Sequence, residues 1–167
     1  FRSMFSTLLD LARIQAGAVD PEIADFALQD VFDRLVAENP GGKVEVTPTR
    51  LHLHSDPVLI ERALRNLVAN ALKHGGDHAR LSARAHGDRA EIIVADDGPG
   101  IPAEEQTRVF DEFVRLGRSE GLGLGLSIVK RFAEALGGKV LCESSPETGQ
   151  IGAAFIVELP IITGSPS

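Results

Sequence analysis

The sequence lacks the features that mark a disulfide-stabilised, secreted or membrane-spanning chain. A single cysteine, Cys142, is present in 167 residues, so an internal disulfide is impossible and a reducing compartment is the natural setting. Cys142 lies in an apolar stretch, and we expect it to pack in the core. No apolar run approaches the roughly 20 residues that a membrane helix needs, and the N-terminus lacks the zones of a signal peptide. We therefore expect a cytoplasmic chain without direct membrane contact, and any membrane anchor of the parent protein would lie in other sequence.

Basic residues are also in deficit. The 17 Lys and Arg residues face 24 Asp and Glu residues, which gives a net charge of -7. This charge disfavours nonspecific attraction to nucleic acid or to anionic membranes, so we expect no nucleic-acid partner. A polyphosphate ligand would need locally placed donors. The length suits one domain with a hydrophobic core and one short appended element.

Hydrophobic periodicity predicts a mixed order of helices and strands. Helices are expected at residues 1–16, 28–38, 56–74, 103–110 and 124–136, with Ser55 as the cap of the third and Asp56 and Pro57 in its first turn. Strands are expected near 44–46 and 51–53 and at 80–86, 90–95, 139–144 and 152–159. This order predicts an α/β (α+β) two-layer sandwich, with a mixed, mainly antiparallel sheet of about five strands covered on one face by about three helices. We expect a helix end and linker at 1–20, the main domain at 21–161 and a disordered tail at 162–167.

The third predicted helix has a polar line beside its apolar stripe. Asn66, Asn70 and Lys73 fall at i, i+4 and i+7, on a different face from the apolar positions. Asparagine inside a helix costs roughly 0.5 kcal/mol relative to alanine, so these amides are either solvent-exposed or used by a ligand. The carboxamide oxygen of Asn70 suits Mg²⁺, which takes further oxygens from water and phosphates. Lys73 can neutralise phosphate charge.

Two glycine-containing motifs follow. Asp96 ends a strand-like run and begins DDGPGI, whose glycines permit close backbone approach, although DGPG alone is an ordinary turn. GLGLGL, residues 121–126, precedes a predicted helix, so its N–H groups could face an anion. A dinucleotide fingerprint is excluded, because Leu126 stands where its third glycine is required, and no GxxxxGK[ST] run is present. Between the two motifs lies FDEF, in which Phe110 and Phe113 enclose two acidic residues. We expect the two phenylalanines to anchor in the core and to hold one end of a lid.

The motifs NLVANALKH, DDGPGI, FDEF and GLGLGL, in this order, resemble the ATP-binding catalytic domain of sensor histidine kinases. That domain belongs to the larger ATPase family that includes gyrase and the mismatch-repair ATPases. The resemblance covers residues 55–160 strongly. More weakly, LLDLARIQAGAV is similar to the end of the dimerisation and phosphotransfer helix that precedes this domain.

The resemblance implies Mg²⁺ and ATP as cofactors and assigns the site. Asn70 would be the magnesium ligand, and Asp96 would accept a hydrogen bond from the adenine amino group. His74 stands where the family usually has an aromatic residue near the adenine or ribose; a plain helix-terminal histidine is the alternative. The candidate catalytic residues are Asn66 and Lys73. The candidate nucleotide-binding residues are Asn70, Lys73, His74, Asp96, Gly98, Gly100, Ile101, Phe113, Arg118, Gly121, Leu122, Gly123, Leu124, Gly125 and Leu126.

Asn66 bears on the type of reaction. In the water-activating relatives and the anti-sigma-factor kinases, a glutamate stands four residues before the magnesium asparagine, whereas here an amide does. An amide cannot act as a general base, which favours phosphoryl transfer to a separate acceptor over hydrolysis. The resemblance implies a histidine followed by Glu or Asp as acceptor, and none of the five histidines has that neighbour. We therefore expect the acceptor histidine to lie outside this chain, on the same or a partner protomer of a homodimeric parent, and a response regulator receiver domain to take the phosphoryl group next.

The lid departs from the family pattern. Only VRLGRSE separates Phe113 from Gly121. Either the lid is naturally short, or the sequence omits some of the lid residues. The phosphate contacts expected from Arg115 or Arg118 depend on which of the two holds. Two other functions remain open from the sequence. One is a degenerate nucleotide-sensing or protein-docking module without phosphotransfer. The other is an independent ATPase, which Asn66 disfavours.

Overall fold

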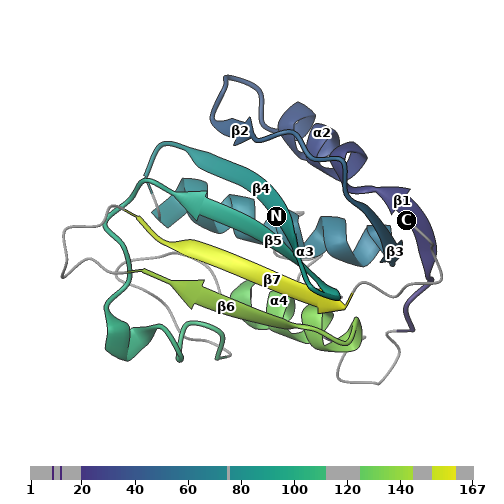
Figure 1. The fold of residues 1–167 in the computed structure, drawn as a ribbon. Helices are drawn as coiled ribbons and strands as arrows, with labels where there is room; N and C mark the ends of the chain where they lie inside the picture. The colour runs from purple at the N-terminus through teal and green to yellow at the C-terminus, as the bar shows by residue number, and fades with distance from the viewer. Residues whose placement is uncertain are drawn as a thin grey trace.

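Among the residues that the structure describes, helices α2, α3 and α4 cover one face of a five-stranded sheet (Figure 1). The structure is a computed structural model and describes residues 9, 12, 20–74, 76–111, 125–144 and 152–160. The helices are α2 (Leu28–Glu38), α3 (Pro57–His74) and α4 (Gly125–Ala135). Across the sheet the strands are β2 (Val44–Val46), β4 (Ala79–His86), β5 (Arg89–Asp96), β7 (Ala154–Pro160) and β6 (Lys139–Glu143). The β2–β4 pair is parallel and the other pairs are antiparallel, which confirms the predicted sandwich.

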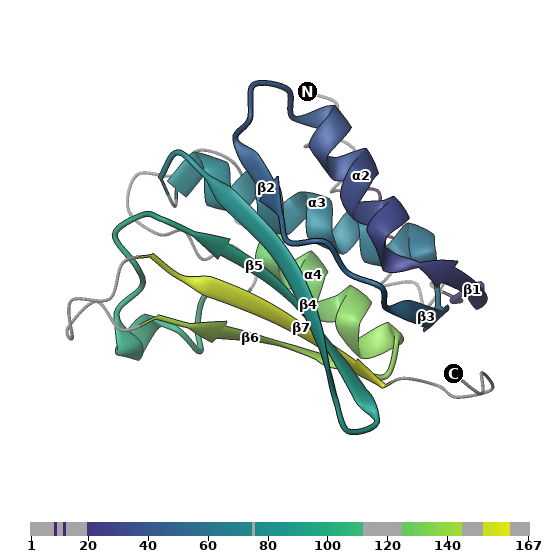
Figure 2. The ribbon, with the colours of Figure 1, turned by 45° about the horizontal axis from the view of Figure 1, so that its top comes forward.

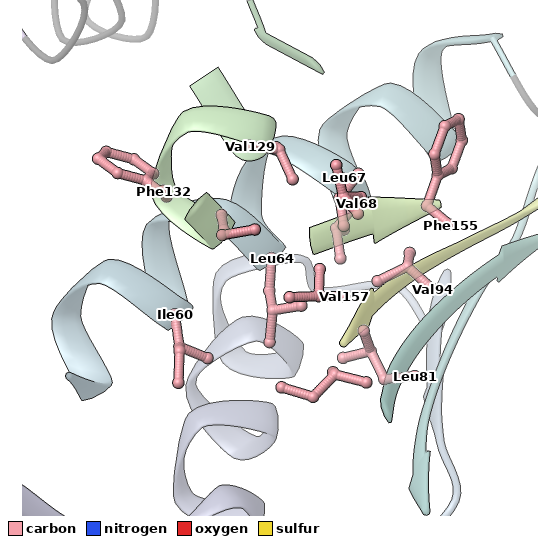
Figure 3. Packing of buried hydrophobic residues seen from close by; sticks show 14 of the residues in the cluster. Ile60, Leu64, Leu67, Val68, Leu81, Val94, Val129, Phe132, Phe155 and Val157 are labelled. Atoms are coloured by element: carbon pink, nitrogen blue, oxygen red, sulfur yellow. The ribbon is translucent and has the colours of Figure 1, made fainter. Parts of the chain in front are cut away.

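The period of two along the central strand explains the two layers. In β5, Ala90, Ile92 and Val94 are fully buried, while the residues between them are partly exposed. The buried row faces α3 and α4, and Figure 2 shows both helices on that side of the sheet. The core lies between these layers, where Leu64 and Leu67 of α3 approach Val94 and its neighbours (Figure 3). The side chain of Cys142 packs against this core, as predicted, and burial raises its pKa to about 12.

The sequence did not predict the first strand. β1 (Ala24–Ala27) pairs antiparallel with β3 (His52–Ser55) in a separate two-stranded sheet. Asp25 lies opposite His54, and their side chains are 2.5 Å apart (Oδ1 to Nδ1). The strand is short and its first residues are exposed, so its sequence carries no clear hydrophobic alternation.

The helix predicted at residues 103–110 is wrong. The structure has a short 3-10 helix, η1 (Ala103–Glu105), followed by turns. Most of the backbone bonds here join residues three apart, such as Glu105 N to the Pro102 carbonyl at 2.9 Å. Burial of Val109 and Phe110 fixes the end of the segment, and the Phe110 ring packs edge-on against Phe155. The predicted anchoring of Phe110 in the core is therefore confirmed.

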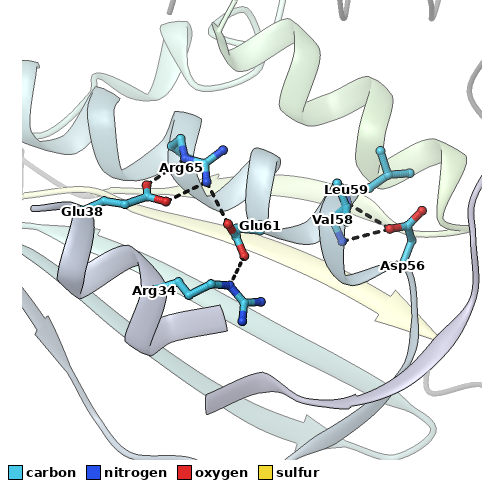
Figure 4. A network of polar contacts seen from close by, with 7 residues as sticks. All are labelled: Arg34, Glu38, Asp56, Val58, Leu59, Glu61 and Arg65. Carbon is cyan, nitrogen blue, oxygen red and sulfur yellow. Dashed lines mark hydrogen bonds and ion pairs between the residues drawn. The ribbon is translucent and has the colours of Figure 1, made fainter. Parts of the chain in front are cut away.

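Asp56, rather than the predicted Ser55, caps α3. Its Oδ1 accepts the backbone N–H groups of Val58 at 2.9 Å and Leu59 at 3.2 Å (Figure 4). Its Oδ2 accepts the N–H of Glu22 at 2.8 Å, which ties the segment before β1 to the start of α3. Pro57 occupies the first helical position, where the missing N–H has no cost.

We expect Asp56→Ala to lower the free energy of unfolding by about 1–2 kcal/mol, because the helix loses its cap. Asp56→Asn keeps an oxygen that can accept from Val58 and Leu59, so it should lose less. Urea denaturation of the two variants and the unmodified chain measures the difference. Equal stability of the alanine variant and the unmodified chain would contradict the role given to this cap.

A network of side chains joins α2 to α3. Arg65 of α3 donates two hydrogen bonds to Glu38 of α2 and one to Glu61, each at 2.8 Å (Figure 4). Arg34 of α2 donates to the other oxygen of Glu61 at 2.6 Å. Because these groups are partly exposed, each pair contributes at most about 1 kcal/mol. The network orients α2 against α3, in addition to the apolar contact between them.

In the described part of the chain, no helix has the length and apolar character needed to cross a membrane.

Candidate nucleotide site

The carboxylate of Asp96 lies on the helix-covered side of the sheet. Asp96 is the last residue of β5 and continues its inward-facing row, and its residue surface is only 6% exposed. Its Oδ1 accepts the N–H groups of Gly98 at 3.0 Å and Ala153 at 3.1 Å. Both hydrogen bonds that described residues donate to this carboxylate go to Oδ1. A ligand can therefore bind Oδ2 without displacing either bond.

Burial raises the pKa of Asp96. The loss of hydration in the site is the main cause, and the N–H groups of Gly98 and Ala153 oppose it only in part. The neighbouring charge of Asp97 raises the pKa further. A buried carboxylate of this kind is destabilising in the empty site, and such groups are common where a ligand is bound.

The backbone just before β7 approaches Asp96 so closely that position 152 requires a glycine. Gly152 has a φ of +80°, and a Cβ atom built on it would lie 1.9 Å from the carbonyl oxygen of Asp96. Any side chain at this position would therefore move the strand end that carries the carboxylate.

The loop after Asp96 is held by two polar side chains that the sequence did not indicate. The Oγ of Ser144 accepts the N–H of Ile101 at 2.9 Å and donates to the carbonyl of Gly152 at 2.8 Å. The Nε2 of Gln106 donates to the carbonyls of Ile101 at 2.9 Å and Ser144 at 2.6 Å. Gly100 within the loop has a φ of +85°, which suits a residue without a side chain. The conformation of the DGPGI loop is therefore held by hydrogen bonds from the side chains of Ser144 and Gln106.

The polar line of α3 is where the sequence predicted it. Asn66 and Asn70 are half-buried and Lys73 is exposed, whereas Leu67 and Ala71 on the adjacent face are buried. His74 is the last residue of the helix. The chain then turns into β4, whose first residue, Ala79, is paired with Asp96. The C-terminal ends of α3 and β5 thus lie at the same end of the sheet.

The structure places part of the predicted site and leaves the rest outside its described ranges. Lys73, in the last turn of α3, and Asp96, at the end of β5, lie at the same end of the sheet, with the loop that contains Gly98, Gly100 and Ile101. Asn70 and Asn66 lie about one and two turns before the end of α3. Gly125 begins α4, and Leu126 packs against the hydrophobic core. The remaining predicted residues lie outside the described residues: Phe113, Arg115, Arg118, Gly121, Leu122, Gly123 and Leu124.

Residues 55–163 match the family described as "Histidine kinase-, DNA gyrase B-, and HSP90-like ATPase". Because this match covers more than half of the chain, the chain belongs to that family of ATPases. Within it, the chain is homologous to sensor histidine kinases. It is 36% identical over 169 residues to the alginate biosynthesis sensor protein KinB of Pseudomonas aeruginosa, which covers 95% of this chain and 28% of the relative.

Solved structures give the same class. The structure of full-length ShkA in complex with AMPPNP is similar over 98% of this chain and 36% of its own, with a TM-score of 0.80 and 28% identity. The mycobacterial sensor histidine kinase MprB is similar over 83% of this chain and 97% of its own, with a TM-score of 0.70 and 29% identity. The chain spans less than a third of the length of the curated relatives that it matches. It is therefore a histidine kinase-type ATPase domain, and what the longer relatives do as whole proteins is a separate matter.

Proposed function

We propose that this domain binds Mg-ATP and transfers the γ-phosphoryl group to a histidine on a phosphotransfer domain outside this chain. The observation that carries the proposal is the position of the buried Asp96 carboxylate at the end of the sheet where α3, the helix that carries Asn66 and Asn70, also ends. The family membership and the similarity to an AMPPNP-bound kinase support it.

The polar groups at the site fit this ligand. Oδ2 of Asp96 would accept a hydrogen bond from the adenine amino group, while its Oδ1 stays bonded to Gly98 and Ala153. The Asn70 carboxamide oxygen would hold Mg²⁺, and Lys73 would offset phosphate charge. When bound, Mg²⁺ supplies neutralisation of the phosphate oxygens during transfer. The glycines of residues 98–100 and 121–125, with Ile101, His74, Phe113 and Arg118, would complete the nucleotide pocket.

Asn66 would favour transfer over hydrolysis. Its carboxamide cannot remove a proton from water, so an attacking water gains no general base from this position. In the transfer, a ring nitrogen of the acceptor histidine attacks the γ-phosphorus, the bond from that phosphorus to the bridging oxygen breaks, and ADP leaves. We propose that the phosphoryl group then passes to an aspartate of a response regulator receiver domain, as in two-component phosphorelays.

The proposal extends to the organisation of the parent protein. Residues 1–20 would be the end of a dimerisation helix and its linker, residues 21–161 the catalytic domain and 162–167 a tail. The parent would be a homodimer that works in the cytoplasm. Any membrane anchor would belong to a part of the parent protein outside these residues. A docking module that never transfers phosphate is the alternative.

Phosphoryl transfer can be tested with γ-labelled ATP. The parent protein should acquire label that is lost in acid and kept in alkali, as a phosphohistidine requires. The isolated domain should acquire none and should release little phosphate. Rapid phosphate release by the isolated domain would favour the independent ATPase instead. Nucleotide binding without any label on the parent protein would favour the docking module.

The affinity for an ATP analogue should fall as the solution is acidified. Protonation of Asp96 removes the acceptor for the adenine amino group, and burial makes this happen at a higher pH than for an ordinary aspartate. The stability of the nucleotide-free domain should show the opposite trend, since the contribution of Asp96 to it should increase as the solution is acidified. Because the folded-state pKa is raised, the contribution of Asp96 to stability is fully present below its unfolded pKa and is lost as pH rises through the folded pKa. Calorimetric titrations across pH measure the first effect, and an affinity independent of pH would contradict it.

A further inference from the structure

Asp97, the second carboxylate of the DDGPGI motif, holds the loop that follows α3. Its Oδ1 accepts the backbone N–H groups of Asp77 at 3.0 Å and His78 at 3.2 Å. Its Oδ2 lies 3.1 Å from the ring Nδ1 of His78. All of these contacts cross from the end of β5 to the short connection between α3 and β4. Asp97 is thus bonded to the α3–β4 connection while Asp96, beside it, is bonded to Ala153, the residue before β7.

The connection is fitted to Asp97 from the other side as well. Gly76 has a φ of +112°, and a Cβ atom built on it would lie 2.4 Å from Oδ1 of Asp97. A side chain here would meet both backbone strain and the carboxylate. The hydrogen bond from His78 is the main cause that lowers the pKa of Asp97, so this acceptor is ionised at neutral pH.

We propose that Asp97 is a positioning residue. It holds the end of α3, which carries Asn70 and Lys73, in the correct position relative to Asp96, the carboxylate that would bind adenine. The inference rests on the proposed function, because it concerns how the two halves of that site are kept together. Asp97 is exposed and bonds a loop backbone, so it is not needed to fill the core.

The loop that carries Asp96 has separate supports. Ser144 and Gln106 hold Ile101, and Asp96 itself is bonded to Gly98 and Ala153. Removal of the Asp97 carboxylate should therefore loosen the α3 side of the site and leave the adenine side in place. Adenosine uses only the adenine side, whereas the Mg²⁺ complex of an ATP analogue uses both.

The test is a pair of calorimetric titrations, one with adenosine and one with Mg-AMPPNP. Asp97→Ala should weaken Mg-AMPPNP binding by about tenfold or more, since hydrogen bonds to a charged acceptor are lost, and should change adenosine binding by less than about twofold. Asp97→Asn keeps an oxygen that can accept from Asp77 and His78, so it should restore most of the Mg-AMPPNP affinity. Asp88→Ala, in the exposed turn at the far end of β4 and β5, is the matched control and should change neither.

Gly76→Ala perturbs the same contact without changing Asp97. It should weaken Mg-AMPPNP binding, and this effect should be smaller in the Asp97→Ala background, because the side chain that it meets is shorter there. Its Cβ would also lie 3.0 Å from the backbone N of Gly98, so selectivity between the two ligands is tested with Asp97→Ala alone. Equal losses for adenosine and Mg-AMPPNP in Asp97→Ala, or no loss for either, would overturn the positioning role. If the unmodified chain bound neither ligand, the proposed function itself would fail, which is a distinct result.

Discussion

Asn70→Ala should abolish the part of nucleotide affinity that depends on magnesium. The Asn70 residue is half-buried near the end of α3, at the end of the sheet where Asp96 also lies, and a methyl group offers no oxygen to Mg²⁺. Loss of groups that only orient a metal ligand typically costs 10–100-fold, so loss of the ligand itself should cost at least about tenfold. Titration of AMPPNP with and without Mg²⁺ measures this dependence directly.

Asn70→Asp provides the matched control for this substitution. It keeps a side-chain oxygen at the same place and should keep magnesium-dependent binding. The melting temperatures of both variants should stay close to that of the unmodified chain, because Asn70 lies outside the buried stripe of α3. Unchanged Mg-AMPPNP affinity in the alanine variant would remove the metal assignment.

Asp96→Asn should remove the preference for adenine. The amide oxygen can still accept the N–H groups of Gly98 and Ala153, while the amide nitrogen takes the place of Oδ2. A donor would then face the adenine amino group, which is itself a donor. Since a hydrogen bond to a charged group contributes about 1.5–3 kcal/mol, AMPPNP affinity should fall by roughly 10- to 100-fold.

The same variant should bind the guanine analogue no worse, because the new amide can donate to the guanine carbonyl oxygen. It should also be at least as stable as the unmodified chain at neutral pH, since it no longer buries a charge. Stability is measured by urea denaturation and selectivity by parallel titrations. An undiminished preference for the adenine nucleotide would contradict the role given to Asp96.

The layers of the fold could be predicted because their signals are local. The apolar stripe of α3 and the alternation along β5 each repeat often enough to identify an element and its buried face. The short β1 strand could not be predicted, because its pairing with β3 is decided by contacts distant in sequence. Residues 103–110 have a helix-like composition, but the buried Val109 and Phe110 and the contacts of Gln106 hold them as turns instead.

The candidate site divides in the same way. Asn70 and Asp96 could be chosen from motifs, and the motifs of the glycine loop and lid predict residues that lie outside the described ranges. The supports of the site could not be chosen. Ser144 and Gly152 are ordinary residues whose roles depend on the position of β7 beside β5, and Asp97 is distinguished only by its bonds to the connection after α3. The helix cap was predicted one residue too early, at Ser55, because only the side-chain geometry shows that Asp56 accepts the N–H groups of the first turn.

The central claim is that the region between the C-terminal ends of α3 and β5 is an Mg-ATP site. Calorimetric titration of the unmodified chain with AMPPNP, with and without Mg²⁺ and beside the guanine analogue, tests it most directly. The account predicts binding that is strengthened by magnesium and selective for adenine. No binding at millimolar ligand, or equal binding of both nucleotides regardless of magnesium, would contradict it.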